Sequence, residues 1–407
     1  MKRLKGALIV AQSGGPTAVI NASLAGVIQQ ALQNPDSISE IYGALHGIEG
    51  VLYEELIDLK QESSETLNLL RITPSSALGS CRHKLTDREY HRILEVFEAH
   101  NVRYFCYIGG NDSMDTAYQV GELASASGYE LRVMGIPKTV DNDLAYTDHC
   151  PGYGSVARWI AIATRDAGLD SEAIGVVDKV KVIECMGRDA GWITAASALA
   201  RDHEDAAPHL IYLPERPISM EQVFRDVQQV YDRLGYCVIT VCEGVRGPDG
   251  KPLVESSSAI DVDAFGHPQR GGVADYLCKA IAGALGLKAR FDKPGTIQRV
   301  GGLLASPIDQ DEAFMAGQMA VIRALEGVTG KMITLERVSN SPYRCETGLV
   351  DLDKVANTEK LMPPEFIAPS GNDITPAFIQ YALPLIGGDL PPYARLAKHR
   401  IPKRAAY

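Results

Sequence analysis

Short apolar runs that end in glycine or in a polar turn alternate along the chain with longer stretches of helical periodicity. Such runs, bounded by turn-forming residues, are typical of buried strands. They predict strands within residues 6–15, 104–110, 131–137, 179–186 and 237–243. Helices are predicted over residues 17–31 and from about Ser113. Strands that alternate with helices in this way indicate an α/β fold with mainly parallel sheets.

Each predicted strand is followed by a turn that carries glycine or polar side chains. In open parallel sheets, ligands bind outside the carboxyl ends of the strands. These turns are therefore the positions at which a functional site is expected.

The composition limits the classes of function. A chain of 407 residues with 45% hydrophobic and 22% charged residues is typical of a globular protein with two or three domain-sized units. The formal net charge of -11 argues against a nucleic-acid-binding surface. The chain has no run of about 18 apolar residues, the length that a membrane-spanning helix needs. We expect a cytoplasmic protein whose eight scattered cysteines are reduced and mostly buried.

The turn from Ser13 to Thr17 places Gly14 and Gly15 between a predicted strand and a predicted helix. Backbone N–H groups at such a turn, together with the helix N-terminus, can bind an anion. An ordinary tight connection between a strand and a helix explains this turn equally well.

The turn that contains Gly109 and Gly110 continues with Asn111 and Asp112, whose oxygens suit a hard cation such as Mg²⁺. The alternative is a helix N-cap, in which Asp112 or Ser113 only satisfies the first amides of the next helix. This turn alone indicates phosphate handling but does not specify a substrate.

Residues 137–143 carry the most informative cluster, with Lys138, Asp141 and Asp143 at one strand end. Phosphoryl transfer needs a carboxylate within reach of the acceptor hydroxyl and a cation for the transferred group. A surface turn in which Asn142 and one aspartate bond to the backbone would explain only part of this cluster.

Later turns supply groups that suit a sugar phosphate. Arg188 follows a predicted strand and could bind a sugar or phosphate oxygen, and Glu243 could accept hydrogen bonds from sugar hydroxyls. Arg290 and Arg299 add two guanidinium groups suited to a phosphate monoester. Taken singly, Arg188 and Glu243 could equally be ordinary ion-pair or helix-cap residues.

Together, the order and spacing of these motifs resemble the phosphofructokinase superfamily along nearly the whole chain. The resemblance implies two Rossmann-like three-layer α/β/α domains with mainly parallel sheets and an active site in the cleft between them. Residues 1–153 and about 300–365 would form the phosphoryl-donor domain. Residues from about 154 to 299, with part of 366–407, would form the sugar-phosphate domain.

The resemblance also implies a role for each motif. The catalytic residues would be Asp141, as the base, with Lys138 and Asp112. The diphosphate site would comprise Gly14, Gly15, Arg82, Gly110 and Lys138. The sugar-phosphate site would comprise Thr139, Val140, Asp141, Met186, Gly187, Arg188, Glu243, Arg290, Thr296 and Arg299. Asn111 and Asp143 would bind the metal cofactor, Mg²⁺.

Two residues point to the diphosphate-dependent branch of the superfamily. ATP-using members commonly have glycine at the positions of Asp112 and Lys138. Here an aspartate adds bulk and like charge against a nucleotide, and a lysine can stabilise charge that develops on diphosphate. The stretch over residues 374–396 also looks like the tail of bacterial diphosphate-dependent members.

Three positions depart from the pattern of the superfamily. Asn111 stands where an aspartate associated with Mg²⁺ is usual, Thr296 where a histidine is usual, and Lys179 where an arginine is usual. Lysine lacks the bidentate fork of arginine, which would weaken or retune binding of the sugar phosphate.

The implied reaction is a reversible transfer from diphosphate to the C1 hydroxyl of fructose 6-phosphate, in glycolysis or gluconeogenesis. Lys179 and Arg290 would reach the substrate of a neighbouring subunit, which implies a homodimer or homotetramer. Three alternatives stay open at this point: an ATP-dependent 6-phosphofructokinase, a kinase of another ketose phosphate such as sedoheptulose 7-phosphate, and a non-catalytic regulatory subunit.

Overall fold

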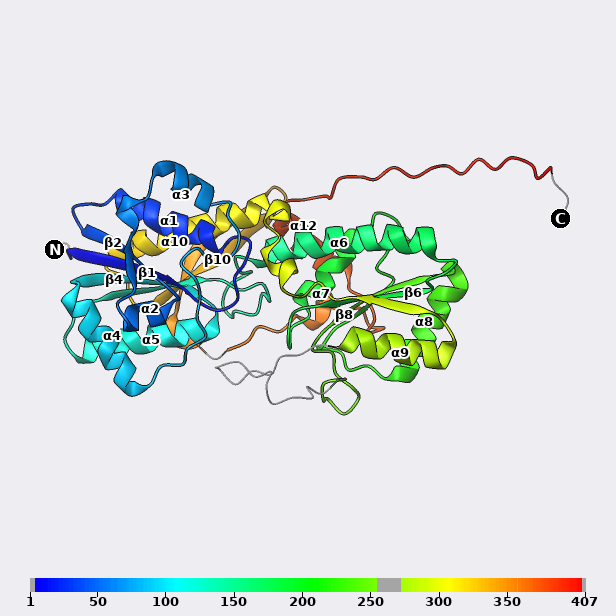
Figure 1. Cartoon of the computed structure of the whole chain (residues 1–407), viewed down its shortest axis with the longest axis horizontal. Helices are drawn as coiled ribbons and strands as arrows, with labels where there is room; N and C mark the ends of the chain where they lie inside the picture. The colour runs from blue at the N-terminus through cyan, green and yellow to red at the C-terminus, as the bar shows by residue number, and fades with distance from the viewer. Residues whose placement is uncertain (1–3, 255–271, 357, 405–407) are drawn as a thin grey trace.

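Two β-sheets, each covered by helices, organise the described residues 4–254, 272–356 and 358–404 of this computed structural model (Figure 1). The larger sheet has the strand order β11-β10-β5-β4-β1-β2-β3. Its strands are β1 (Gly6–Gln12), β2 (Ile38–Ala44), β3 (Leu56–Asp58), β4 (Val102–Gly109), β5 (Arg132–Pro137), β10 (Lys331–Asn340) and β11 (Tyr343–Asp351). Only β3 and β11, at the two edges, run antiparallel to their neighbours.

Helices cover both faces of the larger sheet. They are α1 (Ile20–Leu32), α2 (Ile48–Leu52), α3 (Ser64–Leu70), α4 (Asp87–Ala99), α5 (Asn111–Ala126), α10 (Pro307–Leu325) and α11 (Leu352–Val355). Successive residues of β1 point to opposite faces of the sheet. Leu8 packs in the core beneath α1 and α10, and Ile9 packs in the core beneath α4 and α5. This arrangement gives three layers.

Glycines allow α1 and α10 to pack closely. A Cβ atom on Gly26 would lie 2.2 Å from the carbonyl oxygen of Phe314, and one on Gly317 would lie 2.0 Å from that of Ser23. Both distances are far below van der Waals contact, so a side chain at either position would push the helices apart.

The smaller sheet has the order β7-β8-β6-β9, and all of its strand pairs are parallel. Its strands are β6 (Val180–Cys185), β7 (Leu210–Tyr212), β8 (Cys237–Cys242) and β9 (Ala289–Asp292). Helices α6 (Tyr153–Ile174), α7 (Trp192–Ala196) and α12 (Pro376–Leu385) share a core on one face, and α8 (Met220–Leu234) and α9 (Val273–Leu285) share a core on the other.

Short 3₁₀ helices complete the connections: η1 (Leu59–Gln61), η2 (Ser197–Ala200), η3 (Gly295–Val300), η4 (Gly302–Leu304) and η5 (Pro364–Phe366). The chain returns to the larger sheet through α10, β10 and β11, and then crosses again so that α12 joins the core of the smaller sheet.

The α/β fold with mainly parallel sheets is confirmed, and the five predicted strands correspond to β1, β4, β5, β6 and β8. Two helix starts differ, because α1 begins at Ile20 and not at Thr17, and α5 begins at Asn111 and not at about Ser113. All eight cysteines are unbridged, and seven are buried. Among the described residues, the helices are too short or too polar to cross a membrane.

Candidate active site

The turns that follow the central strands of both sheets line one cleft. Strands β1, β4 and β5 contribute from the larger sheet, and β6 and β8 contribute from the smaller one. The residues that line it are Ser13, Gly14, Gly15, Arg82, Gly110, Asn111, Asp112, Ser113, Lys138, Thr139, Val140, Asp141, Asp143, Met186, Arg188, Glu243 and Arg299. This is the position at which ligands of parallel sheets bind.

The turn after β1 is compact because its two glycines touch charged side chains. A Cβ atom on Gly14, where φ is +77°, would lie 2.9 Å from Nζ of Lys138. A Cβ atom on Gly15 would lie 2.7 Å from Nη1 of Arg299. The loop that carries Arg82 is attached to this turn, because the Ser80 hydroxyl donates a hydrogen bond to the carbonyl of Gly14 (2.6 Å). The glycines therefore bring three cations around one point.

The N-terminus of α5 faces the same cleft. Gly110 is the N-cap residue and has no side chain, so neither Asp112 nor Ser113 is the cap of this helix. The side-chain oxygen of Asn111 accepts a hydrogen bond from the backbone amide of Asp112 (2.9 Å). The positive end of the helix dipole and the oxygens of Asn111 and Asp112 thus lie together at the edge of the cleft.

Lys138 is a buried cation at the floor of the cleft. Its side chain is 3% exposed, and its ammonium donates a hydrogen bond to the carbonyl of Gly15 (3.0 Å). Burial, helped by the nearby charge of Arg299 and opposed by that of Asp141, lowers the pKa of Lys138 to about 8. The ammonium is thus close to titration at neutral pH.

The pKa of Asp141 is shifted in the opposite direction, upwards. Burial raises the pKa of Asp141 to about 7, and the neighbouring carboxylate of Asp143 adds to the increase. Its backbone amide donates to the hydroxyl of Thr139 (3.1 Å), which fixes the direction of the turn. Within the described chain its Oδ1 atom is buried without a hydrogen-bond partner. A carboxylate in this state can accept a proton or bind a cation.

The opposite wall comes from the smaller sheet. The backbone amide of Arg188 donates to the carboxylate of Glu243 (3.4 Å), and burial raises the pKa of Glu243. Gly187 lies behind this wall with φ of +144°, where a Cβ atom would meet the carbonyl oxygen of Ala190 at 2.5 Å. Arg299 reaches the cleft from η3, and burial lowers its pKa. This wall therefore offers two guanidinium groups and one carboxylate.

Three residues of the predicted site lie outside the cleft of this single chain. Arg290, on β9, has 59% of its side chain exposed and pairs with Asp178 (2.8 Å). Thr296 is exposed on η3, and Lys179 lies over the ring of Tyr231 (5.8 Å). A fourth predicted residue, Gly187, does not line the cleft either, whereas all the other predicted residues do.

The sequence interpretation did not assign roles to some residues of this region. Ser13 lines the cleft, and its position beside the first glycine turn is the signal that could have identified it. Gln298 is 1% exposed and accepts a hydrogen bond from the amide of Met186 (3.4 Å). No local pattern marks Gln298, because its partner is distant in the sequence.

The chemistry available here is that of phosphoryl transfer. A carboxylate with a raised pKa and a buried ammonium line the same cleft as the guanidinium groups of Arg82, Arg188 and Arg299. Asn111, Asp141 and Asp143 add oxygen ligands of the kind that a hard divalent cation prefers, and the unpartnered Oδ1 of Asp141 fits such an ion.

The chain is similar to proteins of known type. Residues 7–323 match the family model described as Phosphofructokinase. A pyrophosphate–fructose 6-phosphate 1-phosphotransferase from Halomonas elongata is 46% identical over 408 residues, which cover 97% of each chain. Another with that name from Methylococcus capsulatus is 46% identical, over 94% of this chain and 92% of its own. The crystal structure of a pyrophosphate-dependent phosphofructokinase from Marinobacter aquaeolei is 42% identical, with a TM-score of 0.86 over 99% of both chains.

Proposed function

Because the chain belongs to the phosphofructokinase family, we propose that it transfers a phosphoryl group from diphosphate to the C1 hydroxyl of fructose 6-phosphate. The products are fructose 1,6-bisphosphate and orthophosphate, and the reaction is reversible. The main observation behind the proposal is that Lys138, Asp112 and Asp141 line the same cleft. Relatives that match nearly the full length of the chain are named for this activity.

The choice of donor rests on two charged side chains. Asp112 places a carboxylate at the edge of the cleft, where it adds bulk and like charge against the additional phosphate of a nucleotide. Lys138 places an ammonium at the floor, where water is excluded and a cation stabilises developing negative charge strongly. Both features favour diphosphate over ATP.

Asp141 is the general base in this proposal. It takes the proton of the C1 hydroxyl as that oxygen forms a bond to the terminal phosphorus of diphosphate, in line with the bridging oxygen. The bond between this phosphorus and the bridging oxygen breaks, and orthophosphate leaves with the bridging oxygen. The pKa of about 7 at Asp141 suits a base at neutral pH.

The donor and the acceptor bind on opposite walls. Lys138, Arg82 and the turn at Gly14 and Gly15 bind diphosphate from the side of the larger sheet. The acceptor is held from the side of the smaller sheet, where Arg188 and Arg299 bind its phosphate and hydroxyl oxygens and Glu243 accepts from its hydroxyls. Thr139, Val140 and Met186 line the cleft between the two, and Gly187 allows close backbone packing behind the wall.

Enzymes of this family generally use a divalent metal, and the metal proposed here is Mg²⁺. Asn111 and Asp143, with Asp141, are the residues that would hold it, because their oxygens converge on the cleft. Bound Mg²⁺ would neutralise negative charge on diphosphate.

The proposal also covers the oligomeric state and the cellular location of the enzyme. A homodimer or homotetramer accounts for the positions of Arg290 and Thr296 outside the cleft of one chain, since a neighbouring subunit could bring them to its partner's substrate. A cytoplasmic location, expected from the sequence, completes it.

The test is a set of parallel initial rates of fructose 1,6-bisphosphate formation with Mg²⁺, one with diphosphate and one with ATP. Strong turnover with diphosphate and negligible turnover with ATP is the expected result. Turnover with ATP alone would overturn the choice of donor, and sedoheptulose 7-phosphate as the better acceptor would overturn the choice of sugar.

A further inference from the structure

The segment that carries the base, residues 138–150, runs as an irregular loop from β5 towards α6. Two catalytic candidates, Asp141 and Asp143, flank Asn142 in this loop. Asn142 is fully buried and has φ of +56°, a left-handed conformation that directs its two neighbours to the cleft. The position of both carboxylates therefore depends on what holds Asn142.

Both ends of the Asn142 amide are bonded. Its oxygen accepts from the backbone amide of Cys150 (3.0 Å), and its NH₂ group donates to the hydroxyl of Tyr381 (2.9 Å). That hydroxyl donates in turn to the carbonyl of Asp148 (2.9 Å). One phenol of α12 thus connects the start of the loop to its end.

The ring of Tyr381 is fixed independently of its hydroxyl. It packs against Trp192 and Phe366 with ring centroids 5.4 Å away in each case, and the guanidinium of Arg337 lies 4.6 Å from its centroid. Arg337 also donates to the backbone carbonyl of Tyr381 (2.9 Å) and to Asp148 (3.0 Å). The hydroxyl is therefore presented to Asn142 by a rigid aromatic group.

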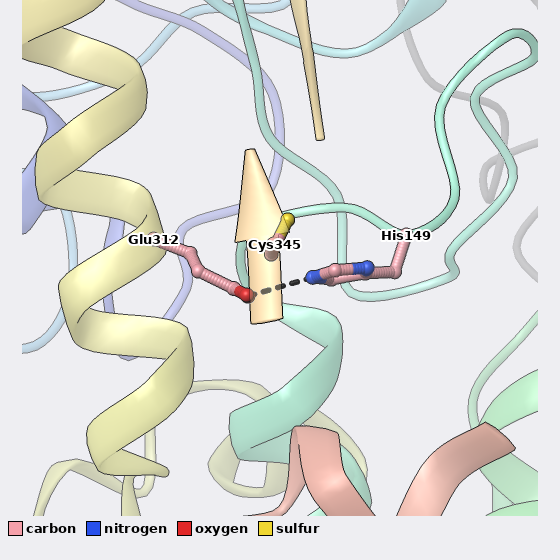
Figure 2. Close-up of side chains that lie close together, drawn as sticks. All are labelled: His149, Glu312 and Cys345. Carbon is pink, nitrogen blue, oxygen red and sulfur yellow. Dashed lines mark hydrogen bonds and ion pairs between the residues drawn. The ribbon is translucent and has the colours of Figure 1, made fainter. Parts of the chain in front are cut away.

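A buried cluster holds the far end of the loop. His149 bonds to Glu312 on α10 (2.6 Å) and lies near Cys345 on β11 (Figure 2). Two atoms bound to one zinc ion at its usual bond lengths would be roughly 3.3 Å apart. The shorter distance here is that of a hydrogen bond, so the cluster acts in this structure as a support for the loop.

We propose that Tyr381 is a positioning residue for catalysis, because its hydroxyl holds Asn142 and thereby aims Asp141 and Asp143 into the cleft. The C-terminal helix α12 is then a working part of the active site, although no residue of α12 lines the cleft. This inference rests on the proposed function, since it assigns Asp141 the role of base.

The decisive variant is Tyr381→Phe, which removes the hydroxyl and keeps the ring. We expect kcat to fall roughly tenfold to a hundredfold, as for a small displacement of a reacting group. The KM values for diphosphate and fructose 6-phosphate should stay within about twofold, because no contact to either substrate is removed. Amide hydrogen exchange over residues 141–150 should become faster.

The matched control is Tyr129→Phe. The hydroxyl of Tyr129 also has two hydrogen-bond partners, since it shares its proton between the carbonyls of Phe97 (2.9 Å) and Val102 (2.5 Å), but it lies at the end of the larger sheet opposite to the cleft. This variant should lose stability in the same way while its kcat stays near that of the wild type. Equal losses of kcat in the two variants would overturn the inference.

A double-mutant cycle tests the route through Asn142. Glycine tolerates the left-handed backbone, so Asn142→Gly removes the side chain without strain. If Tyr381 acts through Asn142, adding Tyr381→Phe to Asn142→Gly should lower kcat no further. Additive losses would overturn the route.

The two hypotheses fail in different ways. A wild-type enzyme without diphosphate-dependent turnover would overturn the proposed function, while hydrogen exchange would still test whether Tyr381 orders the loop. A wild-type enzyme with full turnover and a Tyr381→Phe variant with unchanged kcat would overturn this inference alone.

Discussion

The ammonium of Lys138 lies 3.0 Å from the carbonyl oxygen of Gly15, and this contact joins the turn after β5 to the turn after β1. Any side chain at Gly14 would approach the same ammonium to 2.9 Å. The charge of Lys138 is therefore held in a fixed place, in a pocket that leaves room for a ligand only on the side of the cleft. A cation held in this way needs no rearrangement when charge develops on the donor.

Replacement of Lys138 by methionine should lower kcat with diphosphate by about 10²–10³-fold, comparable to the removal of one preorganised donor. Stability at pH 7 should not fall, because the lowered pKa of Lys138 means that burial disfavours its charged form. Kinetics and thermal unfolding check both points. The control is Lys331→Met, since Lys331 pairs with Asp351 away from the cleft; an equal loss in the control would contradict the role of Lys138.

The pH dependence of kcat/KM for diphosphate should be a narrow bell. The base must be ionised, so activity should rise with pH through about 7, the pKa of Asp141. The ammonium must be protonated, so activity should fall through about 8, the pKa of Lys138. The profile of kcat/KM reports the ionisation of groups in the free enzyme. An alkaline limb that persists in Lys138→Met would exclude Lys138 as its origin.

Replacement of Asp141 by asparagine should lower kcat by roughly 10²–10⁴-fold, the usual contribution of a general base. The raised pKa of Asp141 also predicts a gain in stability. A group with a raised folded pKa contributes stability below its unfolded pKa of 3.8 and loses that contribution as pH rises through about 7. The variant should therefore unfold at a higher temperature than the wild type at pH 8, and the difference should shrink towards pH 4. Near-normal turnover would remove Asp141 from the role of base.

The local sequence pattern was sufficient to predict the strands that lead to the cleft and the turns that follow them. Residues 137–143, for example, reveal their chemistry because the charged side chains are adjacent in the sequence. The start of α5 was placed two residues too late, because Gly109 to Asp112 look like a turn in the sequence. The start of α1 was placed three residues too early, because Thr17 begins a turn in which its hydroxyl accepts from the amide of Val19 (3.2 Å). Six of the described strands were not predicted, namely β2, β3, β7, β9, β10 and β11.

Long-range contacts could not be predicted in the same way. Asn142 and Tyr381 are 239 positions apart, and Met186 and Gln298 are 112 positions apart. A tyrosine on an apolar helix face is indistinguishable in the sequence from any other core residue. Only the packing of α12 against α6 and α7 brings its hydroxyl to the loop.

Replacement of Asp112 by glycine tests the choice of donor. Removal of the carboxylate should open the edge of the cleft and relieve repulsion, so turnover with ATP should appear or increase while turnover with diphosphate falls. Initial rates with both donors measure the change. Asp115→Gly is the control, because Asp115 lies on the same helix, outside the set of residues that line the cleft, and carries a similar cost of glycine in a helix. Unchanged use of ATP in Asp112→Gly would contradict the role assigned to Asp112.

Arg290 provides a test of the assembly. If its guanidinium binds the sugar phosphate of a neighbouring subunit, Arg290→Ala should raise the KM for fructose 6-phosphate by about ten- to a hundredfold, the value of a hydrogen bond to a charged group. Its partner in this chain, Asp178, would still pair with Lys288 (2.7 Å), so the loss in stability should be small.

Subunit mixing makes this prediction specific. A mixed dimer of Arg290→Ala and Asp141→Asn chains has one site with both defects and one site with neither. Random reassembly of equal amounts of the two variants should therefore restore about a quarter of the wild-type sites. The assay uses a low concentration of fructose 6-phosphate, at which each variant alone is nearly inactive. If activity after mixing only equals the average of the two variants, Arg290 acts within its own chain or not at all, and the shared site is wrong.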